Sequence, residues 1–476
     1  MKIYAYALAF LACMSFGVAQ PVNLNNAKAP KNVIIMISDG CGYNHIQATN
    51  LYQHGEFESQ SYEKFPVKLF MSTYPAMTEA GKALVPARSY SSVDAWNDFR
   101  YVMRDATCSG AAATAMATGV KTYNGTIGMG LDRKPLKNLS ELAIEKQKSA
   151  GVVTSVPWSH ATPAGFVAHN VHRDIYSEIA KEMLTESKLS VIMGCGNPYY
   201  DNNGNKLANA KTFKYVGDSI TWSDLNKQNS ITLGGKQVQD INRDGRPDAW
   251  KHIQNVNDFQ ALAEGKNLPL RIVGTAMIES TLQEGRDINQ TDWKPVSKGK
   301  TEDPNELIAN RNKNVPDLED MAKGALNVLN QNPNGFFLMI EGGAIDWAAH
   351  SNLTARMIAE EIYFNNAVNR VIEWIETNSS WDETLLIVTA DHETGYITAP
   401  YKGEEGKRWE QLEKSPKGTL PNIQWNSDNH TNSLVPLFAK GVCSEYLNLF
   451  ADETDLRRGK YLNNTEPAQL LFLLWR

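Results

Sequence analysis

Five apolar runs stand out in the pattern of hydrophobic and polar positions along the chain. Each run has six or seven residues with several of Val, Ile, Leu, Met or Phe, which is typical of strands buried on both faces of a parallel sheet. The runs are NVIIMI (32–37), GVVTSV (151–156), LSVIMG (189–194), GFFLMI (335–340) and TLLIVTA (384–390). We therefore expect these five segments to form the centre of a sheet.

Two segments between these runs repeat apolar residues at helical spacing instead. The spacing predicts helices at 318–330 and 354–378. Strands that alternate with helices indicate an α/β fold of three layers, α/β/α, around a large central and mainly parallel sheet. In such sheets ligands bind beyond the carboxyl ends of the strands.

Two polar stretches interrupt this rhythm. Residues 197–300 are rich in Asn, Asp and Gly and carry few strand signals, which predicts a loop insertion. Residues 400–425 predict a short surface excursion. Because no linker divides the chain, we expect residues 20–476 to form a single domain.

Composition and charge narrow the class of protein. The chain has 476 residues, of which 42% are hydrophobic and 21% are charged, as in ordinary globular proteins. A net charge of −6 argues against nucleic-acid binding through a basic face. No run is long enough to span a membrane.

The first residues, MKIYAYALAFLACMSFGVAQ, read as a secretory signal peptide over 1–19. This predicts an exported protein, periplasmic or extracellular. A lipoprotein signal ending at Cys13 is the alternative, but Phe10 fits that pattern poorly. Four cysteines remain after cleavage, too few for a disulfide scaffold, and one or two bridges or none are all compatible with the sequence.

The stretch RDATCSGAAATAMATG (104–119) places Thr107, Cys108 and Ser109 directly before an Ala-rich run. Alanine favours helix, and a helix N-terminus offers free N–H groups to an anion. A Ser or Thr at this place is also an ordinary helix cap. The stretch alone leaves open which of the three residues has a chemical role.

Carboxylates and histidines follow three of the apolar runs at the place where a site is expected. These residues are Asp39, Glu341, Asp346, His350, Asp391 and His392. Asp346 and His350 are four residues apart, so a helix would place both on one face. Each piece alone is typical of a turn or an exposed pair, but together they form the ligand set that zinc prefers.

At this point the sequence resembles the alkaline phosphatase family. The resemblance covers roughly residues 30–445 and rests on six motifs in the family's order. They are SDGCG, TCSGAAATAMATGVKTYNGTIG, HATPAGFVAHNVHR, IEGGAIDWAAH, VTADHETG and HTNSLVPLFAKG. The ordered set is far more specific than any one motif.

The resemblance implies two zinc ions and one magnesium ion. The first zinc would be held by Asp346, His350 and His430. The second would be held by Asp39, Asp391 and His392, with Ser109 beside it. The magnesium site would be formed by Asp39, Thr162 and Glu341. Arg173 falls where the family keeps its phosphate-binding arginine.

The implied activity is hydrolysis of small phosphate monoesters through a phosphoserine intermediate on Ser109. The alternative is a phosphodiesterase of the same metallo-hydrolase superfamily. A sulfatase is disfavoured because TCSGAA lacks the Pro and Arg of the sulfatase motif. Many relatives are homodimers and some are monomers, so a homodimer is one of two open states.

Three positions near the expected metal and phosphate groups depart from the commonest family pattern. Cys108 stands where many members carry an Asp that orients the phosphate-binding arginine, which predicts weaker phosphate binding or faster product release. His160 stands where others have Asp or His, and Trp347 where others have Lys or His. Cys41 is also unusual, and a bridge between Cys41 and Cys108 is a hypothesis.

A separate metal signal lies in the polar insertion. In DINRDGRPD (240–248), four residues occupy positions 1, 3, 5 and 9 of a calcium-loop pattern, and Gly245 occupies the turn position. The four are Asp240, Asn242, Asp244 and Asp248. Position 12 is Lys251 rather than an acid, so calcium is a candidate and a plain loop is the alternative.

Overall fold

The computed structural model describes residues 27–80, 83–286, 302–403 and 409–476. The expected signal peptide, residues 1–19, lies outside the described residues. Among the helices within those ranges, none combines the length and apolar character that crossing a bilayer requires. The cysteines in the same ranges are free thiols, so the hypothetical bridge between Cys41 and Cys108 is not formed.

The described residues form one large sheet of eleven strands in the order β18-β19-β2-β17-β12-β1-β11-β5-β6-β10-β9. The strands from β12 to β9 are parallel to one another, whereas β17 runs antiparallel to β12. The five predicted runs are the five adjacent strands at its centre. They are β1 (Asn32–Ser38), β5 (Ser149–Pro157), β6 (Val191–Cys195), β11 (Phe336–Gly342) and β12 (Thr384–Thr389).

Six further strands extend this centre on both sides. On one side lie β17 (Val435–Gly441), β2 (Val67–Ser72), β19 (Gly459–Asn463) and β18 (Glu453–Asp455). On the other side lie β10 (Ile272–Thr275) and β9 (Lys251–Ile253). These last two come from the polar segment 197–300, for which composition predicts loops. The apolar stretch of β10 is only four residues long, too short to stand out from its polar surroundings.

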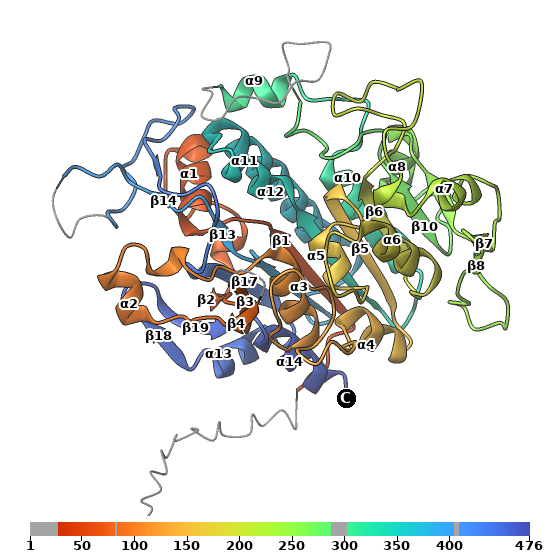
Figure 1. The fold of residues 1–476 in the computed structure, drawn as a ribbon, viewed down its shortest axis with the longest axis horizontal. Helices are drawn as coiled ribbons and strands as arrows, with labels where there is room; N and C mark the ends of the chain where they lie inside the picture. Colours follow the sequence, from red (N-terminus) through yellow and green to blue (C-terminus); the bar gives the residue numbers. More distant parts are fainter. Residues whose placement is uncertain (1–26, 81–82, 287–301, 404–408) are drawn as a thin grey trace, which may run out of the picture.

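Two groups of helices cover the sheet and complete three layers (Figure 1). The first group packs around the long helix α12 and consists of α1 (Tyr43–His54), α8 (Val256–Ala263), α10 (Leu318–Leu329), α11 (Ala344–His350) and α12 (Thr354–Asn378). The second consists of α3 (Ser109–Thr118), α4 (Leu139–Glu145), α5 (Ala161–Gly165) and α14 (Glu466–Leu474). Every residue of β1 is buried because helices cover both faces.

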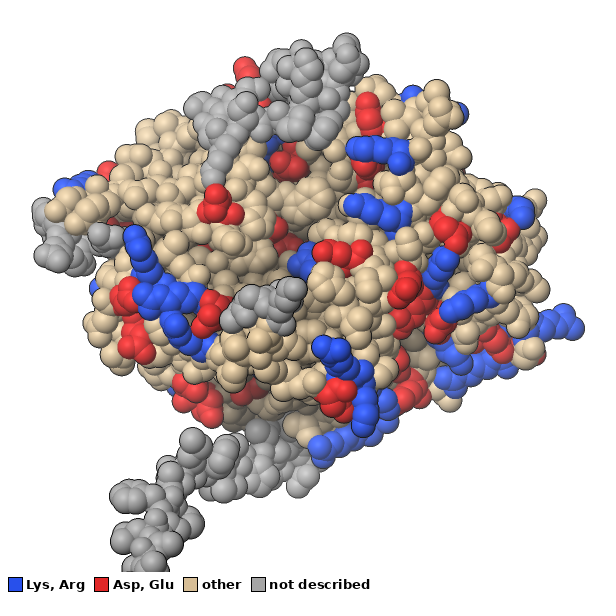
Figure 2. All heavy atoms as spheres, in the orientation of Figure 1, with Lys and Arg blue, Asp and Glu red and all other residues tan. Residues whose placement is uncertain are grey.

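The surface shows no field of one sign on the face drawn in Figure 2, where Lys and Arg alternate with Asp and Glu. This agrees with the modest net charge of −6. The excursion at 400–425 returns to the body through β15 (Gln424–Trp425), which pairs with β14 (Ile397–Thr398). On this face no patch of one sign marks a surface for a highly charged partner.

Candidate metal centre and nucleophile

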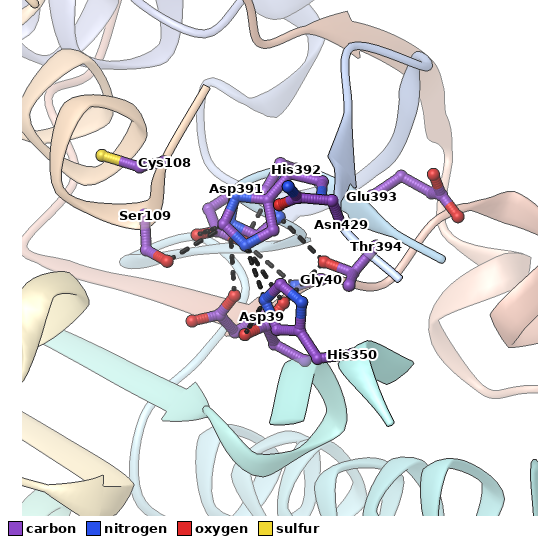
Figure 3. A network of polar contacts seen from close by, with 12 residues as sticks. Asp39, Gly40, Cys108, Ser109, His350, Asp391, His392, Glu393, Thr394 and Asn429 are labelled. Carbon is purple, nitrogen blue, oxygen red and sulfur yellow. Dashed lines mark hydrogen bonds and ion pairs between the residues drawn. The ribbon is translucent and has the colours of Figure 1, made fainter. Parts of the chain in front are cut away.

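Acidic and histidine side chains converge at the carboxyl ends of β1, β11 and β12. Two trios gather there, Asp39 with Asp391 and His392, and Asp346 with His392 and His430, and the ligand atoms of each trio lie within 4.8 Å of one another. Figure 3 shows Asp39, Asp391, His392 and His350 pointing toward a common centre, and His350 Nε2 lies 3.3 Å from Asp346 Oδ2. Every predicted zinc ligand therefore comes to one place in the fold.

Regular backbone geometry explains how the ligands meet. Parallel pairing aligns Ile37 of β1 with Glu341 of β11 and with Thr389 of β12, so the polar residues that follow emerge at one edge. Helix α11 begins after Gly343, and its pitch places Asp346 Oδ2 3.3 Å from His350 Nε2.

His430 comes from far along the chain. It lies on β16 (His430–Thr431), which pairs with β13 (Glu393–Thr394) directly after His392. Its ring stacks on that of His392 with centroids 3.7 Å apart, and its Nε2 lies 3.5 Å from Asp346 Oδ1. The short ladder therefore brings the last ligand into the centre.

The histidine nitrogens have the arrangement that metal binding requires. His350 Nδ1 lies 2.7 Å from the carbonyl oxygen of Asp428, and His430 Nδ1 lies 2.8 Å from that of Thr107. Because a carbonyl only accepts, each Nδ1 must donate. In the neutral rings each Nε2 therefore carries a lone pair that can bind a metal. These Nε2 atoms are 3.0 Å apart, a spacing that a cation between them would stabilise.

Buried oxygen atoms without partners point to the same conclusion. Within the described part of the chain, Asp39 Oδ1, Glu341 Oε1 and Asp391 Oδ2 are buried and accept no hydrogen bond. Burying an unpaired carboxylate is costly, and bound cations would remove that cost by coordinating these oxygens. Carboxylate and imidazole groups suit zinc, and the oxygen donors of Asp39, Thr162 and Glu341 suit magnesium. The residues present fit the implied ions.

The electrostatics of the apo cluster are those of crowded acids. Burial, together with the charges of Asp391, Asp346 and Glu341, raises the pKa of Asp39 well above its usual range. Burial raises the pKa of Glu341 to about 7 and that of Asp391 to about 6. Burial also opposes the charge of Asp346, but the neighbouring His350 and His430 hold its pKa well below the usual range.

The expected magnesium residues are adjacent to this cluster. Thr162, in α5, donates from Oγ1 to Asp39 Oδ2 at 3.3 Å, and Glu341 is the penultimate residue of β11. Thr154 of β5 donates a hydrogen bond to Glu341 Oε2. The three predicted oxygen donors therefore lie together, with Thr154 supporting one of them.

Ser109 is the hydroxyl that faces the metal cluster. It is the first residue of α3, and its Oγ lies 3.2 Å from His392 Nε2. Thr107 instead donates to the carbonyl oxygen of Cys108 at 3.3 Å. Cys108 occupies the cap position without a side-chain cap bond, and its sulfur points away from the cluster (Figure 3). Of the three candidates, only Ser109 is aimed at the centre.

Arg173 lies beside Cys108 at the start of α3. The backbone N–H of Gly125 donates to Cys108 Sγ at 3.1 Å, and the backbone N–H of Arg173 donates to the carbonyl oxygen of Gly125 at 2.6 Å. Burial disfavours the charge of Arg173, but Cys108, Tyr176 and Asp39 outweigh it and raise the pKa of the guanidinium. Arg173 is therefore a half-buried cation that packs near Gly110 at the start of α3 and feels the charge of Asp39.

The rings of His160 and Trp347 contact each other, and His160 lies close enough to Arg173 to feel its charge. Their centroids are 5.6 Å apart, and His160 also stacks on Tyr176 at 5.6 Å. Burial and the positive charges of Arg173 and Lys214 lower the pKa of His160 to about 3. His160 is therefore neutral near pH 7 and supplies no charge to an anion.

Several supporting residues escaped the sequence analysis although they lie inside its motifs. Thr394, two residues after His392, donates to Asp346 Oδ1 at 2.5 Å. Asn432, two residues after His430, accepts from the backbone N–H of Thr107 at 3.2 Å. Their signal was their place within VTADHETG and HTNS, and only the fold assigns them a partner.

The calcium candidate lies far from this centre in an exposed loop. Its carboxylates accept backbone N–H groups: Asp240 accepts from Arg243 and Gly245, and Asp248 accepts from Ile241. Asn242 and Asp244 join the same network. Such bonds are typical of Asx turns in any loop, so calcium binding stays a prediction.

A family model described as alkaline phosphatase matches residues 30–420. Alkaline phosphatase 4 of Bacillus subtilis (strain 168) is 30% identical over 503 residues, which cover 93% of this chain and 88% of the relative. The alkaline phosphatase of Escherichia coli (strain K12) is 27% identical over 454 residues, which cover 90% of this chain and 85% of the relative.

Solved structures with the same fold are also similar to this chain. Alkaline phosphatase from the Antarctic bacterium TAB5 aligns with a TM-score of 0.59 at 23% identity, covering 94% of this chain and 100% of that chain. The Thermus thermophilus enzyme aligns with a TM-score of 0.60 at 20% identity, covering 97% and 95%. A variant of the TAB5 enzyme, with a TM-score of 0.58 at 22% identity and coverage of 94% and 99%, was solved with Mg bound in its M3 site.

Proposed function

The chain belongs to the alkaline phosphatase family of phosphoric monoester hydrolases, and on that premise we propose that it acts through a phosphoserine intermediate on Ser109. The observation that carries this proposal is the position of Ser109 Oγ, at a helix N-terminus and 3.2 Å from His392 Nε2. The hydroxyl thus stands between a group of metal ligands and a set of free backbone N–H groups.

We assign each ion to the ligand residues that the family resemblance implies. Asp346, His350 and His430 would hold one zinc, and Asp39, Asp391 and His392 would hold the other. Asp39, Thr162 and Glu341 would hold magnesium. When bound, these ions lower the pKa of a hydroxyl group or water in contact with them and neutralise charge on phosphate oxygens. The buried oxygens without partners support the assignment.

The residues of the chain provide the rest of the reaction. Ser109 Oγ forms a bond to phosphorus, and the bond from phosphorus to the ester oxygen breaks in line with it, which releases the alcohol. Arg173 binds two phosphate oxygens through its planar fork. The N–H groups of the first turn of α3 face the same anion. The alcohol leaves with the proton that Ser109 gives up. The oxygen of a water molecule then bonds to phosphorus, the bond from phosphorus to Ser109 Oγ breaks, and a proton of that water returns to Oγ as inorganic phosphate leaves.

The choice of substrate class is tested by comparing three esters with one aryl group. We expect the purified chain, supplied with Zn²⁺ and Mg²⁺, to hydrolyse the aryl phosphate monoester far faster than the matching diester or sulfate. The reason is that the proposed roles of Arg173, Thr162 and Glu341 are those of a site for a phosphate with three free oxygens. A higher kcat/KM for the diester would overturn the assignment in favour of the phosphodiesterase alternative.

Replacing Cys108 with aspartate tests the effect of having a thiol, where many family members have a carboxylate, next to the nucleophile. A carboxylate next to Arg173 would hold the guanidinium by charge-assisted hydrogen bonds. We expect Cys108→Asp to bind inorganic phosphate about three- to tenfold more tightly, measured as the inhibition constant, and to lower kcat through slower product release. Cys108→Ser is the uncharged control. An unchanged inhibition constant in the Asp variant would show that Cys108 does not influence Arg173.

Three further assignments rest on sequence. Export to the periplasm or the exterior is proposed from residues 1–19, and the first residue of the mature protein would test it. Calcium binding at 240–248 would appear in a calorimetric titration of the purified protein. A homodimer, the state of many relatives, would appear in sedimentation.

A further inference from the structure

A row of aromatic rings leads from the metal centre toward the surface. Trp347, next to Asp346, contacts His160, and His160 stacks on Tyr176 with an interplanar angle of 15°. Tyr176 in turn meets Tyr215 edge-to-face at 5.0 Å between centroids. The row therefore joins the expected phosphate site to the polar segment 197–300.

Lys214 stands at the outer end of this row. Its Nζ lies 4.6 Å from the ring centroid of Tyr215 and 5.2 Å from that of Tyr176. The side chain is exposed, and the two rings hold its ammonium group by cation–π contact. A cation is thus fixed over the tyrosine that contacts His160.

Lys214 differs from the lysines around it. Lys181 is paired with Asp218 at 2.5 Å, and Lys211 with Glu279 at 2.6 Å. Lys214 has ring contacts but no ion pair among the described residues. Asp174, two residues before Tyr176, accepts a hydrogen bond from the Tyr176 hydroxyl at 3.3 Å. The ammonium group is therefore available to an anion that enters the site.

We propose that Lys214 binds a second anionic group on the alcohol part of the substrate, so that the enzyme favours phosphate monoesters whose alcohol carries a carboxylate or a further phosphate. Arg173 would hold the ester phosphate at the start of the row, and Lys214 would hold the second anion at its end. This inference rests on the proposed monoesterase activity and adds a substrate class to it.

The test compares two substrates that differ by one carboxylate, glycerol 3-phosphate and 3-phosphoglycerate. In Lys214→Gln we expect kcat/KM for 3-phosphoglycerate to fall about three- to fivefold, as for one exposed ion pair, with the value for glycerol 3-phosphate within about twofold of the wild type. Lys214→Glu should lower the ratio further, because it places a like charge at the same point. Added salt should reduce the wild-type ratio by screening.

The matched control is Lys188→Gln, which also removes one exposed lysine charge. Lys188 precedes the amino end of β6, whereas the site lies at the carboxyl ends of the strands. This control should leave the ratio unchanged. An equal fall for both substrates, or no fall, in Lys214→Gln would overturn the inference. Failure to hydrolyse either substrate in the wild type would instead count against the monoesterase activity, so the two failures are distinguishable.

Discussion

Replacing Ser109 with alanine is expected to lower kcat/KM for an aryl phosphate by about four orders of magnitude. The variant loses the only hydroxyl of the 107–109 stretch that faces the metal ligands, and nucleophile deletions in other hydrolases have effects of this size. Steady-state kinetics measures the loss. Labelled substrate, quenched in acid, should leave phosphate on the wild-type chain and none on Ser109→Ala.

Thr107→Ala is the matched control for the same stretch. Thr107 Oγ1 donates to the carbonyl oxygen of Cys108, so removing it should change the rate only by a small factor. Full activity in Ser109→Ala together with a large loss in Thr107→Ala would transfer the nucleophile to Thr107.

Metal removal is expected to have the second largest effect. Treatment with EDTA should lower activity to below about 1% of its starting value, and Zn²⁺ with Mg²⁺ should restore it. The thermal midpoint, Tm, should fall by several degrees, because bound ions stabilise the folded state and their loss leaves buried oxygens of Asp39, Glu341 and Asp391 without partners. Differential scanning calorimetry measures this shift.

The fall in Tm should depend on pH in a defined direction. In the chelated protein the pKa of Glu341 is raised to about 7 and that of Asp391 to about 6, whereas unfolded carboxyl groups titrate near pH 4. The folded apo state therefore binds more protons, and it loses stability as pH rises from about 4 to 7. The shift in Tm should be larger at pH 8 than at pH 5.5.

Asp391→Asn provides an internal comparison for this experiment. It removes one of the buried charges, so chelation should shift its Tm by less than in the wild type. If EDTA changed neither activity nor Tm in the wild type, the metal assignment would be wrong.

The centre of the fold was predictable because its strands are covered on both faces. Five apolar runs such as 32–37 and 384–390 became five adjacent parallel strands. The flanking strands were not predictable in this way. β10 has only the residues Ile272–Thr275, and β9 passes from an exposed to a buried position within three residues. Their pairing depends on neighbours that a local pattern does not contain.

The site residues also differ in how far the sequence predicted their positions. The spacing of Asp346 and His350 predicted one helix face, and α11 places both there. His430 has no such local signal, because a two-residue ladder with β13 determines its position. The proposed role of Lys214 was likewise not predictable from sequence. Its ring partners Tyr176 and Tyr215 connect to the expected phosphate site only through tertiary contacts with His160 and Trp347. Local spacing identified some ligands, whereas tertiary pairing assembled the rest.

The place of β1 in the sheet has a consequence for synthesis. Val33 pairs with Phe337 on one side and with Leu385 on the other. A ribosome completes β1 first and its two partners much later, so the strand must wait unpaired while most of the chain is made. Closing such distant pairs slows folding and exposes an apolar edge that invites aggregation. The centre of the sheet, and with it the catalytic edge, can therefore close only late, and the nascent chain depends on being kept apart from its neighbours until then.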